Sequence, residues 1–162
     1  MFGATIATGI GSGTIPDIAD STLQAAEALP WTSIYIGDEL CDHLLPTSVP
    51  QQHQIIVLRR GGCSFAAKLK NIPSFLQSSS ALQLVILVTP PEYDASISMI
   101  RPLVDQVQHT PSGMPRFNPI PMIMIEGDEK TEEMLRYAKG IGLRRRYYLS
   151  SQGLRIDNLH VV

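Results

Sequence analysis

The sequence contains little charge and no hydrophobic run long enough to cross a membrane. Only 17% of its 162 residues are charged and the net charge is -2, which argues against a broad electrostatic surface for nucleic acid. The longest apolar stretch, residues 82–88, is interrupted by Gln83 and is far shorter than a bilayer requires. The start of the chain lacks a basic segment followed by a long apolar one, so we expect any secretory signal to lie upstream. We therefore expect neither a nucleic-acid partner nor a membrane partner.

The sequence also lacks the compact motifs of common catalytic sites. It contains no His-Glu-x-x-His zinc signature and no Gly-x-Ser-x-Gly nucleophile elbow. The four histidines are scattered, at His43, His53, His109 and His160. Acidic residues form two adjacent pairs, Asp128–Glu129 and Glu132–Glu133. We interpret these pairs as a solvated helix face, because a glycosidase needs two facing carboxyl groups several ångströms apart, and we expect the chain to hydrolyse neither peptides nor mannosides.

Three glycines alternate after the first predicted strand, at Gly9, Gly11 and Gly13. A dinucleotide-binding loop also needs the third glycine of its Gly-x-Gly-x-x-Gly fingerprint and a helix that begins directly after it. Here Pro16 follows instead, so we favour a flexible turn.

The densest group of potential metal ligands comprises Asp38, Glu39, Asp42 and His43. A metal site usually needs further ligands from elsewhere in the chain and a supporting second shell. Acidic residues near the start of a helix are the ordinary alternative, and we favour that interpretation.

A basic and aromatic cluster comprises Arg144, Arg145, Arg146, Tyr147 and Tyr148. Such a cluster could contact phosphate or RNA. In a single strand its members would alternate between the two faces, and the chain is acidic overall, so an ordinary surface is the favoured interpretation.

The chain contains two cysteines, Cys41 and Cys63. They can form one bridge in an oxidising compartment or remain thiols in a reducing one, and composition does not decide between these states. Cys63 with a distant histidine could in principle act as a thiol nucleophile. With Cys41 present, a bridge is the simpler account.

The hydrophobic pattern and the turn residues predict one α/β domain. Predicted strands cover residues 2–10, 55–58, 82–88, 122–125, 143–149 and 154–161, with a short apolar run at 33–36 and a turn at 150–153. Predicted helices cover residues 21–29, 65–72, 97–107 and 129–139, with one or two helical turns in 38–45 and loops at 47–54 and 109–119. Ser64 and Asp128 are predicted N-caps. Strand 55–58, the helix after Ser64 and strand 82–88 form a βαβ unit, which implies parallel pairing.

Residues 55–68 resemble the signature of the protease-associated domain family. That signature is an apolar strand followed by Arg-Gly-x-Cys-x-Phe-x-x-Lys at the start of a helix. Five positions match it: Arg60, Gly61, Cys63, Phe65 and Lys68. The family's later Ile-Pro motif before a strand is matched by Ile120 and Pro121, whereas Ser80-Ala81 stands where the family often has Gly-Ala.

The resemblance implies a protease-associated fold, with β/β/α swivelling-type layers, a mixed sheet and flanking helices. It implies a single domain over residues 1–162, which a strand pair over 143–162 would close. It also places the chain in an oxidising lumen and thereby implies a Cys41–Cys63 disulfide. The motif residues are then structural rather than catalytic: Arg60, Gly61, Gly62, Cys63, Phe65, Lys68 and Pro121. Domains of this family make protein contacts or cover a neighbouring active site, so we expect no cofactor in this chain.

Residues 68–75 and 146–159 look like the C-terminal protease-associated region of fungal ER degradation-enhancing α-mannosidase-like proteins, of glycoside hydrolase family 47. There, catalysis belongs to a separate (α/α) barrel that holds calcium, so none of its site residues can be carried over. The resemblance implies an accessory interaction domain in the ER lumen. Its partners would be the neighbouring catalytic domain and a misfolded glycoprotein or an oxidoreductase. The alternative is a lid or ligand-binding domain of a peptidase or a sorting receptor, and a free-standing enzyme is a third reading.

Overall fold

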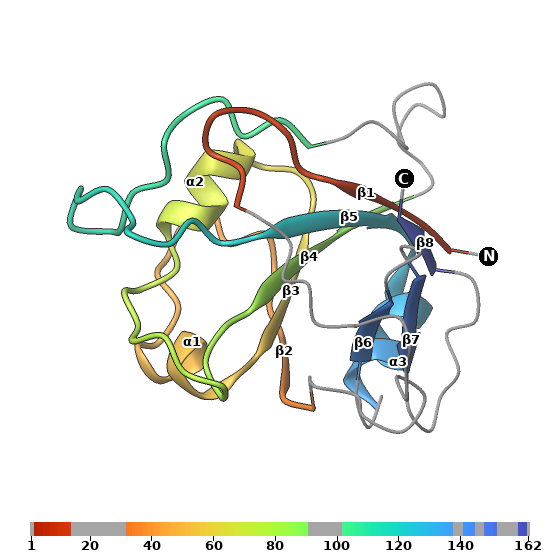
Figure 1. Ribbon diagram of the computed structural model, residues 1–162. Helices are drawn as coiled ribbons and strands as arrows, with labels where there is room; N and C mark the ends of the chain where they lie inside the picture. Colours follow the sequence, from red (N-terminus) through yellow and green to blue (C-terminus); the bar gives the residue numbers. More distant parts are fainter. Residues whose placement is uncertain are drawn as a thin grey trace.

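The computed structural model describes residues 2–13, 32–90, 102–137, 141–144, 148–151 and 159–161. Within these residues one mixed sheet of eight strands is flanked by three short helices (Figure 1). The strands are β1 (Phe2–Ile6), β2 (Ile34–Ile36), β3 (Ile55–Arg59), β4 (Leu84–Thr89), β5 (Met122–Glu126), β6 (Ile141–Arg144), β7 (Tyr148–Ser151) and β8 (Leu159–Val161). The helices are α1 (Ser48–Gln52), α2 (Phe65–Lys70) and α3 (Glu129–Arg136).

The strand order is β2-β3-β4-β5-β1-β8-β7-β6. Strands β2 to β5 run parallel, and β1 is antiparallel to β5. The predicted βαβ unit is confirmed, since β3 and β4 pair in parallel on either side of α2 in the chain. The coarse prediction of an α/β fold with a mixed sheet is therefore confirmed.

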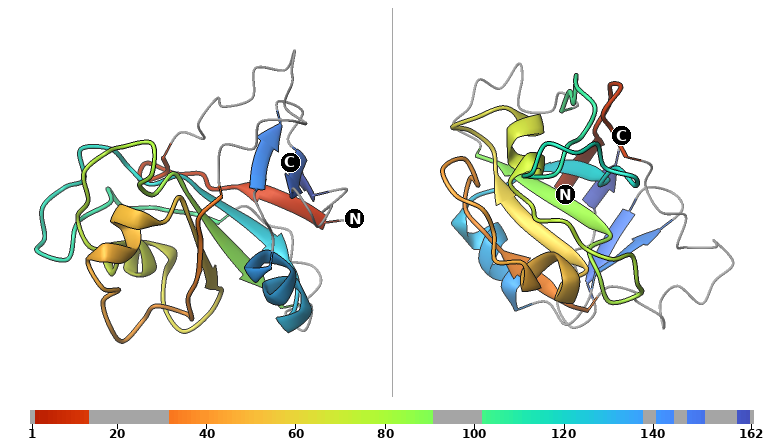
Figure 2. Two further views of the ribbon diagram at one scale, coloured as in Figure 1. Left: turned by 90° about the horizontal axis from the view of Figure 1, so that it is seen from below. Right: turned by 90° about the vertical axis from the view of Figure 1, so that its left-hand side faces the viewer.

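Strand β4 is the centre of the core, and all six of its residues are buried. Its side chains alternate between two apolar clusters, because successive residues of a strand point to opposite faces. Ile86 belongs to the cluster that contains Leu135 of α3, and Leu87 to the cluster that contains Leu69 of α2 and Val49 of α1. Helix α3 thus covers one face of the sheet, while α1 and α2 cover the other (Figure 2).

The two predicted helix caps are present. The side chain of Ser64 accepts a hydrogen bond from the backbone N–H of Ala67 at the start of α2. At the start of α3, Asp128 accepts from the N–H groups of Lys130 and Thr131, and the Thr131 hydroxyl accepts from the N–H of Asp128. These short polar side chains satisfy N–H groups that have no partner within the helix.

Two predictions around residue 45 are wrong. Residues 47–54, predicted as a loop, contain helix α1, whose third residue Pro50 lies in the first turn, where a missing N–H costs nothing. Residues 38–45, predicted to hold helical turns, contain no helix. The reason is Leu40, which is fully buried with a φ of 55°, outside the right-handed helical region.

The predictions for the end of the chain are also wrong in detail. Residues 143–149 do not form one strand, because β6 and β7 pair antiparallel with Arg144 opposite Tyr148. Ser150, which was predicted in a turn, belongs to β7, so three strands replace the predicted two. Residues 145–147, between these two strands, include no glycine or proline, so the sequence contains no turn signal there. Strand β8 pairs with β1 in parallel and with β7 antiparallel.

Of two further helix predictions, one lies wholly and the other partly outside the described residues. The predicted helix 21–29 lies outside the described residues. Of the predicted helix 97–107, residues 102–107 are described and form no helix, and Leu103 makes a parallel bridge with Thr8. Among the described residues, no helix combines the length and the apolar character needed to cross a membrane.

The alternating glycines after β1 form a turn whose backbone is packed against the segment before β5. The N–H of Gly11 donates to the carbonyl of Val104 at 3.0 Å. The buried Gln108 side chain donates to the carbonyls of Gly11 and Ile120, at 2.7 and 2.9 Å, and accepts from the N–H of Ile120. A Cβ atom on Gly11 would overlap the carbonyl oxygen of Gln106. Close backbone packing, rather than phosphate binding, explains the glycine at this position.

We predict that Gly11→Ala destabilises the chain by about 2 kcal/mol or more, because the added methyl group has no space between backbone segments. The measurement is chemical denaturation of the 162-residue chain. Gly113→Ala is the control, because Gly113 has a φ of 91° but open space around its Cα; backbone strain alone should cost about 1–2 kcal/mol there. A cost at Gly11 no larger than that at Gly113 would contradict the packing argument.

Candidate functional site

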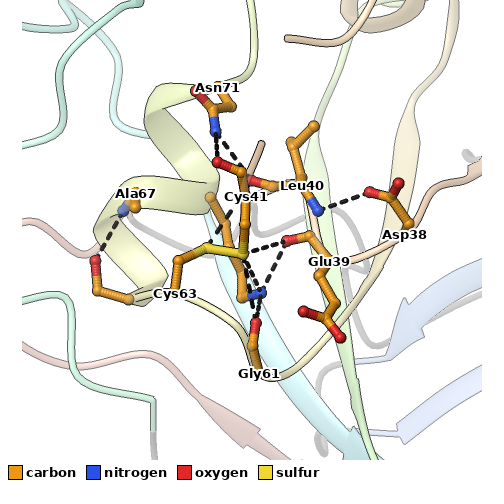
Figure 3. Close-up of a disulfide and its surroundings, with 10 residues drawn as sticks. Asp38, Glu39, Leu40, Cys41, Gly61, Cys63, Ala67 and Asn71 are labelled. Carbon is orange, nitrogen blue, oxygen red and sulfur yellow. Dashed lines mark hydrogen bonds between the residues drawn. A yellow bond between two sulfur atoms is a disulfide. The ribbon is translucent and has the colours of Figure 1, made fainter. Parts of the chain in front are cut away.

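The predicted disulfide between Cys41 and Cys63 is present, with the two Cα atoms 5.8 Å apart (Figure 3). It joins the loop after β2 to the residue before the cap of α2. A bridged sulfur is not a thiolate nucleophile, so this structure does not support the catalytic interpretation of Cys63. The bridge fits an oxidising, secretory compartment.

Lys68 ties the same loops together from inside the molecule. Its side chain is fully buried, and Nζ donates to the carbonyls of Gly61 at 2.6 Å and Glu39 at 2.8 Å. Burial lowers the pKa of Lys68, while the neighbouring carboxylates of Glu39 and Asp38 act in the opposite direction. Asn71, just after α2, donates to the carbonyls of Leu40 at 3.0 Å and Cys41 at 3.4 Å. Figure 3 shows these contacts converging on the loop around Leu40.

The two glycines of the motif are required by this arrangement. Gly61 and Gly62 have φ angles of 114° and 80°, in the left-handed region that favours glycine. A Cβ atom on Gly62 would in addition overlap the carboxylate of Glu39 and crowd the sulfur of Cys41.

The remaining motif residues also have structural contacts. Arg60 donates to the hydroxyl of Thr89 at 3.4 Å. Phe65 packs against the apolar cluster beneath α2. The carbonyl of Pro121 accepts from the N–H of Val85 at 2.9 Å, just before β5 begins. The motif therefore holds α2, the disulfide loop and the sheet together, and we call this contact set the Lys68 knot.

We predict that Lys68→Met destabilises the chain by about 2–4 kcal/mol, because it removes the buried ammonium group that donates to the carbonyls of Gly61 and Glu39. The measurement is the free energy of unfolding by denaturant. Lys70→Met is the matched control, because Lys70 is exposed on the same helix; it should change the stability by no more than about 0.5 kcal/mol. Similar losses in both variants would contradict a specific role for Lys68.

We also predict that the denatured, unreduced chain contains no titratable thiol. Reducing the bridge should lower the stability by about 3 kcal/mol, because a loop with a sequence separation of 22 residues is then no longer closed in the unfolded state. Material made under oxidising conditions that titrates with two free thiols would contradict this prediction.

The structure does not assemble the sequence-predicted metal ligands into a site. Within the described residues, no group of three or more His, Cys, Asp or Glu side chains is placed to hold a metal ion. Asp38 accepts from the N–H of Leu40 at 2.7 Å and lies 3.6 Å from Nε2 of His43, with both side chains half exposed. Asp42 is exposed. Since no helix starts here, the favoured helix-start explanation for these acids is wrong.

The described histidines lie in separate parts of the fold, and most of the basic cluster lies outside the described residues. Nδ1 of His53 donates to the carbonyl of Val49 and the ring packs edge-on against Tyr35, whereas His109 makes a backbone bridge with Pro115. His160 lies on β8. Of the basic cluster, residues 145–147 lie outside the described residues, and the predicted alternation along one strand is wrong because the chain reverses there.

One acidic residue was misassigned to a solvated face. Glu132 of α3 is only 8% exposed and receives two hydrogen bonds from Arg59, from Nε at 2.8 Å and from Nη2 at 3.3 Å. This pair links α3 to the end of β3, and Glu132 raises the pKa of Arg59. Glu129 and Glu133 are exposed, as predicted.

A groove lies between the segment after α2 and the loop before β5. Two adjoining pockets form it, with volumes of about 320 and 190 Å³. Both are lined by Phe75, Gln77 and Asn118. The larger adds Leu82, Gln83 and residues 119–121, and the smaller adds Ser74, Thr110 and residues 115–117. We call the two pockets together the Arg116 groove; the loop that carries Arg116 runs beside α2 in Figure 1.

Arg116 carries the only charge among the described residues that line this groove. Its Nη2 donates to the carbonyls of Leu69, at 2.9 Å, and Ile72 at the end of α2. Its Nε is buried and has no hydrogen-bond partner among the described residues. Desolvation lowers the pKa of Arg116 to about 10. The desolvation cost of the charged Arg116 is therefore fully present below about pH 10 and is relieved as the pH rises above it, because the folded chain releases this proton before the unfolded chain does.

The groove also exposes apolar side chains at its edge. Phe117 is 96% exposed, and Leu76, next to the shared Phe75, is 79% exposed. Sequence analysis missed this site and assigned residues 109–119 only to an exposed loop. The available signal was a cation and an aromatic residue between two prolines, at Pro115 and Pro119.

A scan against protein-family models found no match to this chain, and a search of curated proteins found none either.

Proposed function

We propose that this chain is a protease-associated domain that serves as a non-catalytic, protein-binding accessory module. The observation that carries the proposal is the Arg116 groove, a hollow with exposed aromatic and aliphatic side chains at its edge. Exposed apolar groups beside a pocket are typical of surfaces that bind another molecule.

The Lys68 knot supports the assignment to the protease-associated family. In that resemblance the Arg-Gly-x-Cys-x-Phe-x-x-Lys residues are structural, and here Lys68 and the Cys41–Cys63 bridge hold loops rather than facing a cavity. A scaffold of this kind leaves ligand binding to loops that it positions. The Arg116 groove is built from such loops.

The parent protein in this proposal is an ER α1,2-mannosidase-like protein of glycoprotein quality control, with a calcium-dependent catalytic domain next to this one. The disulfide supports a lumenal setting, since it forms in oxidising compartments. The domain would hold a misfolded glycoprotein near the catalytic site and so raise its effective concentration there. An oxidoreductase is the other partner that this setting supplies.

We predict that deletion of this segment from the parent enzyme slows mannose removal from misfolded glycoproteins much more than from free oligosaccharide. A free oligosaccharide is bound by the catalytic domain alone, so it gains nothing from tethering. The measurement is a comparison of rates for the full-length and deleted enzymes on both substrates.

The melting temperature of the deleted enzyme is the control for a loss of folding. Equal losses on both substrates, or no loss on either, would count against substrate recruitment and leave a purely structural role.

A further inference from the structure

We propose that the Arg116 groove binds an extended peptide segment, with a carboxylate side chain on Arg116 and an apolar side chain two residues away in the larger pocket. This proposal rests on the proposed protein-binding function and names the chemistry that the groove recognises.

The charge of Arg116 is not balanced by a counter-ion among the described residues that line the groove. A guanidinium has five N–H donors, and the hydrogen bonds to Leu69 and Ile72 both come from Nη2. Donors therefore remain on the other nitrogens, and Nε is buried without a partner among the described residues. A desolvated cation without a counter-ion is unfavourable, and desolvation is the only cause of the lowered pKa of Arg116. A ligand carboxylate would remove that imbalance by a charge-assisted hydrogen bond.

Arg59 provides a contrast with Arg116. Arg59 already has Glu132 as a two-point partner. Among the described residues, no Asp or Glu lines the Arg116 groove. An incoming acidic group would therefore meet Arg116 without competition or repulsion from the groove itself.

The groove combines amide and aromatic side chains. The amides of Gln77 and Asn118 can each donate to a peptide carbonyl and accept from a peptide N–H. Gln83 offers only its amide oxygen as an acceptor, because its nitrogen already donates to the carbonyls of Ser78 and Ala81. Phe75 lines both pockets and offers an apolar wall between them. The larger pocket, at about 320 Å³, lies at the lower end of the size range of ligand pockets.

The spacing of side chains along an extended peptide also suits two adjoining pockets. In an extended chain, side chains two residues apart point to the same face and lie about 7 Å apart. Two such side chains can therefore enter two adjoining pockets that share a wall. A neutral mannose chain has no group that would neutralise Arg116, so we favour peptide over glycan as the occupant.

The experiment titrates blocked pentapeptides into the 162-residue chain and measures binding by calorimetry or by amide chemical shifts. Two peptides carry a Phe and a Glu two residues apart, in the two possible orders, and two matched peptides carry Gln in place of Glu. We expect one Glu peptide to bind about tenfold more tightly than its Gln counterpart, as for an added charged hydrogen bond. A free high-mannose oligosaccharide, titrated in parallel, should not compete.

Gln77→Glu is the variant of choice, because it places a carboxylate of nearly the same shape into the groove without touching the contacts of Arg116 to α2. It should abolish the preference for Glu over Gln. Gln52→Glu is the matched control, because Gln52 is exposed on α1 and lines neither pocket; it should keep the preference. Arg116→Gln should also abolish it, and its melting temperature shows whether the lost contacts to α2 unfold the chain.

Equal affinity for the Glu and Gln peptides would overturn the proposal, as would an equal loss in the Gln52→Glu control. Competition by the oligosaccharide would identify a glycan site instead. The proposed function and the carboxylate preference of the groove can fail separately. If deletion impairs glycoprotein trimming while the groove shows no carboxylate preference, the proposed function stands and this inference fails. If the preference is found but deletion affects both substrates equally, the groove stands and the recruitment role fails.

Discussion

The buried ammonium group of Lys68 holds the loop after β2 and the turn after β3 against helix α2. Lys68 is fully buried, and its ammonium group is satisfied by backbone carbonyls of Glu39 and Gly61, which lie far apart in the chain. A buried ammonium tolerates few alternative arrangements, because every unsatisfied donor in a desolvated site is costly. Leu40, which follows the Glu39 carbonyl, and Gly61 both have left-handed backbone conformations at this contact.

The sheet beneath this knot gives it a rigid base. Strand β4 is buried on both faces, so the two apolar clusters share one strand and α2 cannot shift independently of the sheet. On the opposite face the pair Arg59–Glu132 ties α3 to the end of β3. The carboxyl end of β3 is therefore connected to α3 through Arg59 and Glu132, and the Gly61 carbonyl just beyond it is connected to α2 through Lys68. The loop that leaves this end of β3 thus starts from a fixed point.

The Arg116 groove depends indirectly on these contacts of α2 and the sheet. Arg116 donates to the carbonyls at the end of α2, and α2 is held by Lys68 and its Ser64 cap. The other wall, the loop before β5, is held by Gln108 through its hydrogen bonds to Gly11 and Ile120. Loops that are fixed at both walls can present a preformed groove, which lowers the entropy lost on binding.

The sequence by itself determined the elements whose cause is local. The runs of apolar residues at β3, β4 and β5, and the caps Ser64 and Asp128, depend only on neighbours in the chain, and all were predicted. The left-handed Leu40 and the reversal between β6 and β7 were not, because neither has a local turn signal. The disulfide was reached through a family resemblance, since two cysteines alone do not decide their redox state.

The tertiary structure alone decided the candidate site. In the sequence, Arg116 is marked only by its place beside Phe117 between two prolines, which does not by itself identify a binding residue. Its significance arises from its hydrogen bonds to the end of α2, more than 40 residues away in the chain, and from a groove in which no described residue supplies a carboxylate. Likewise, Glu132 looks like any exposed helical acid until the sheet brings Arg59 beside it. Desolvation and pairing are decided by which segments meet, and no pattern within one segment contains that information.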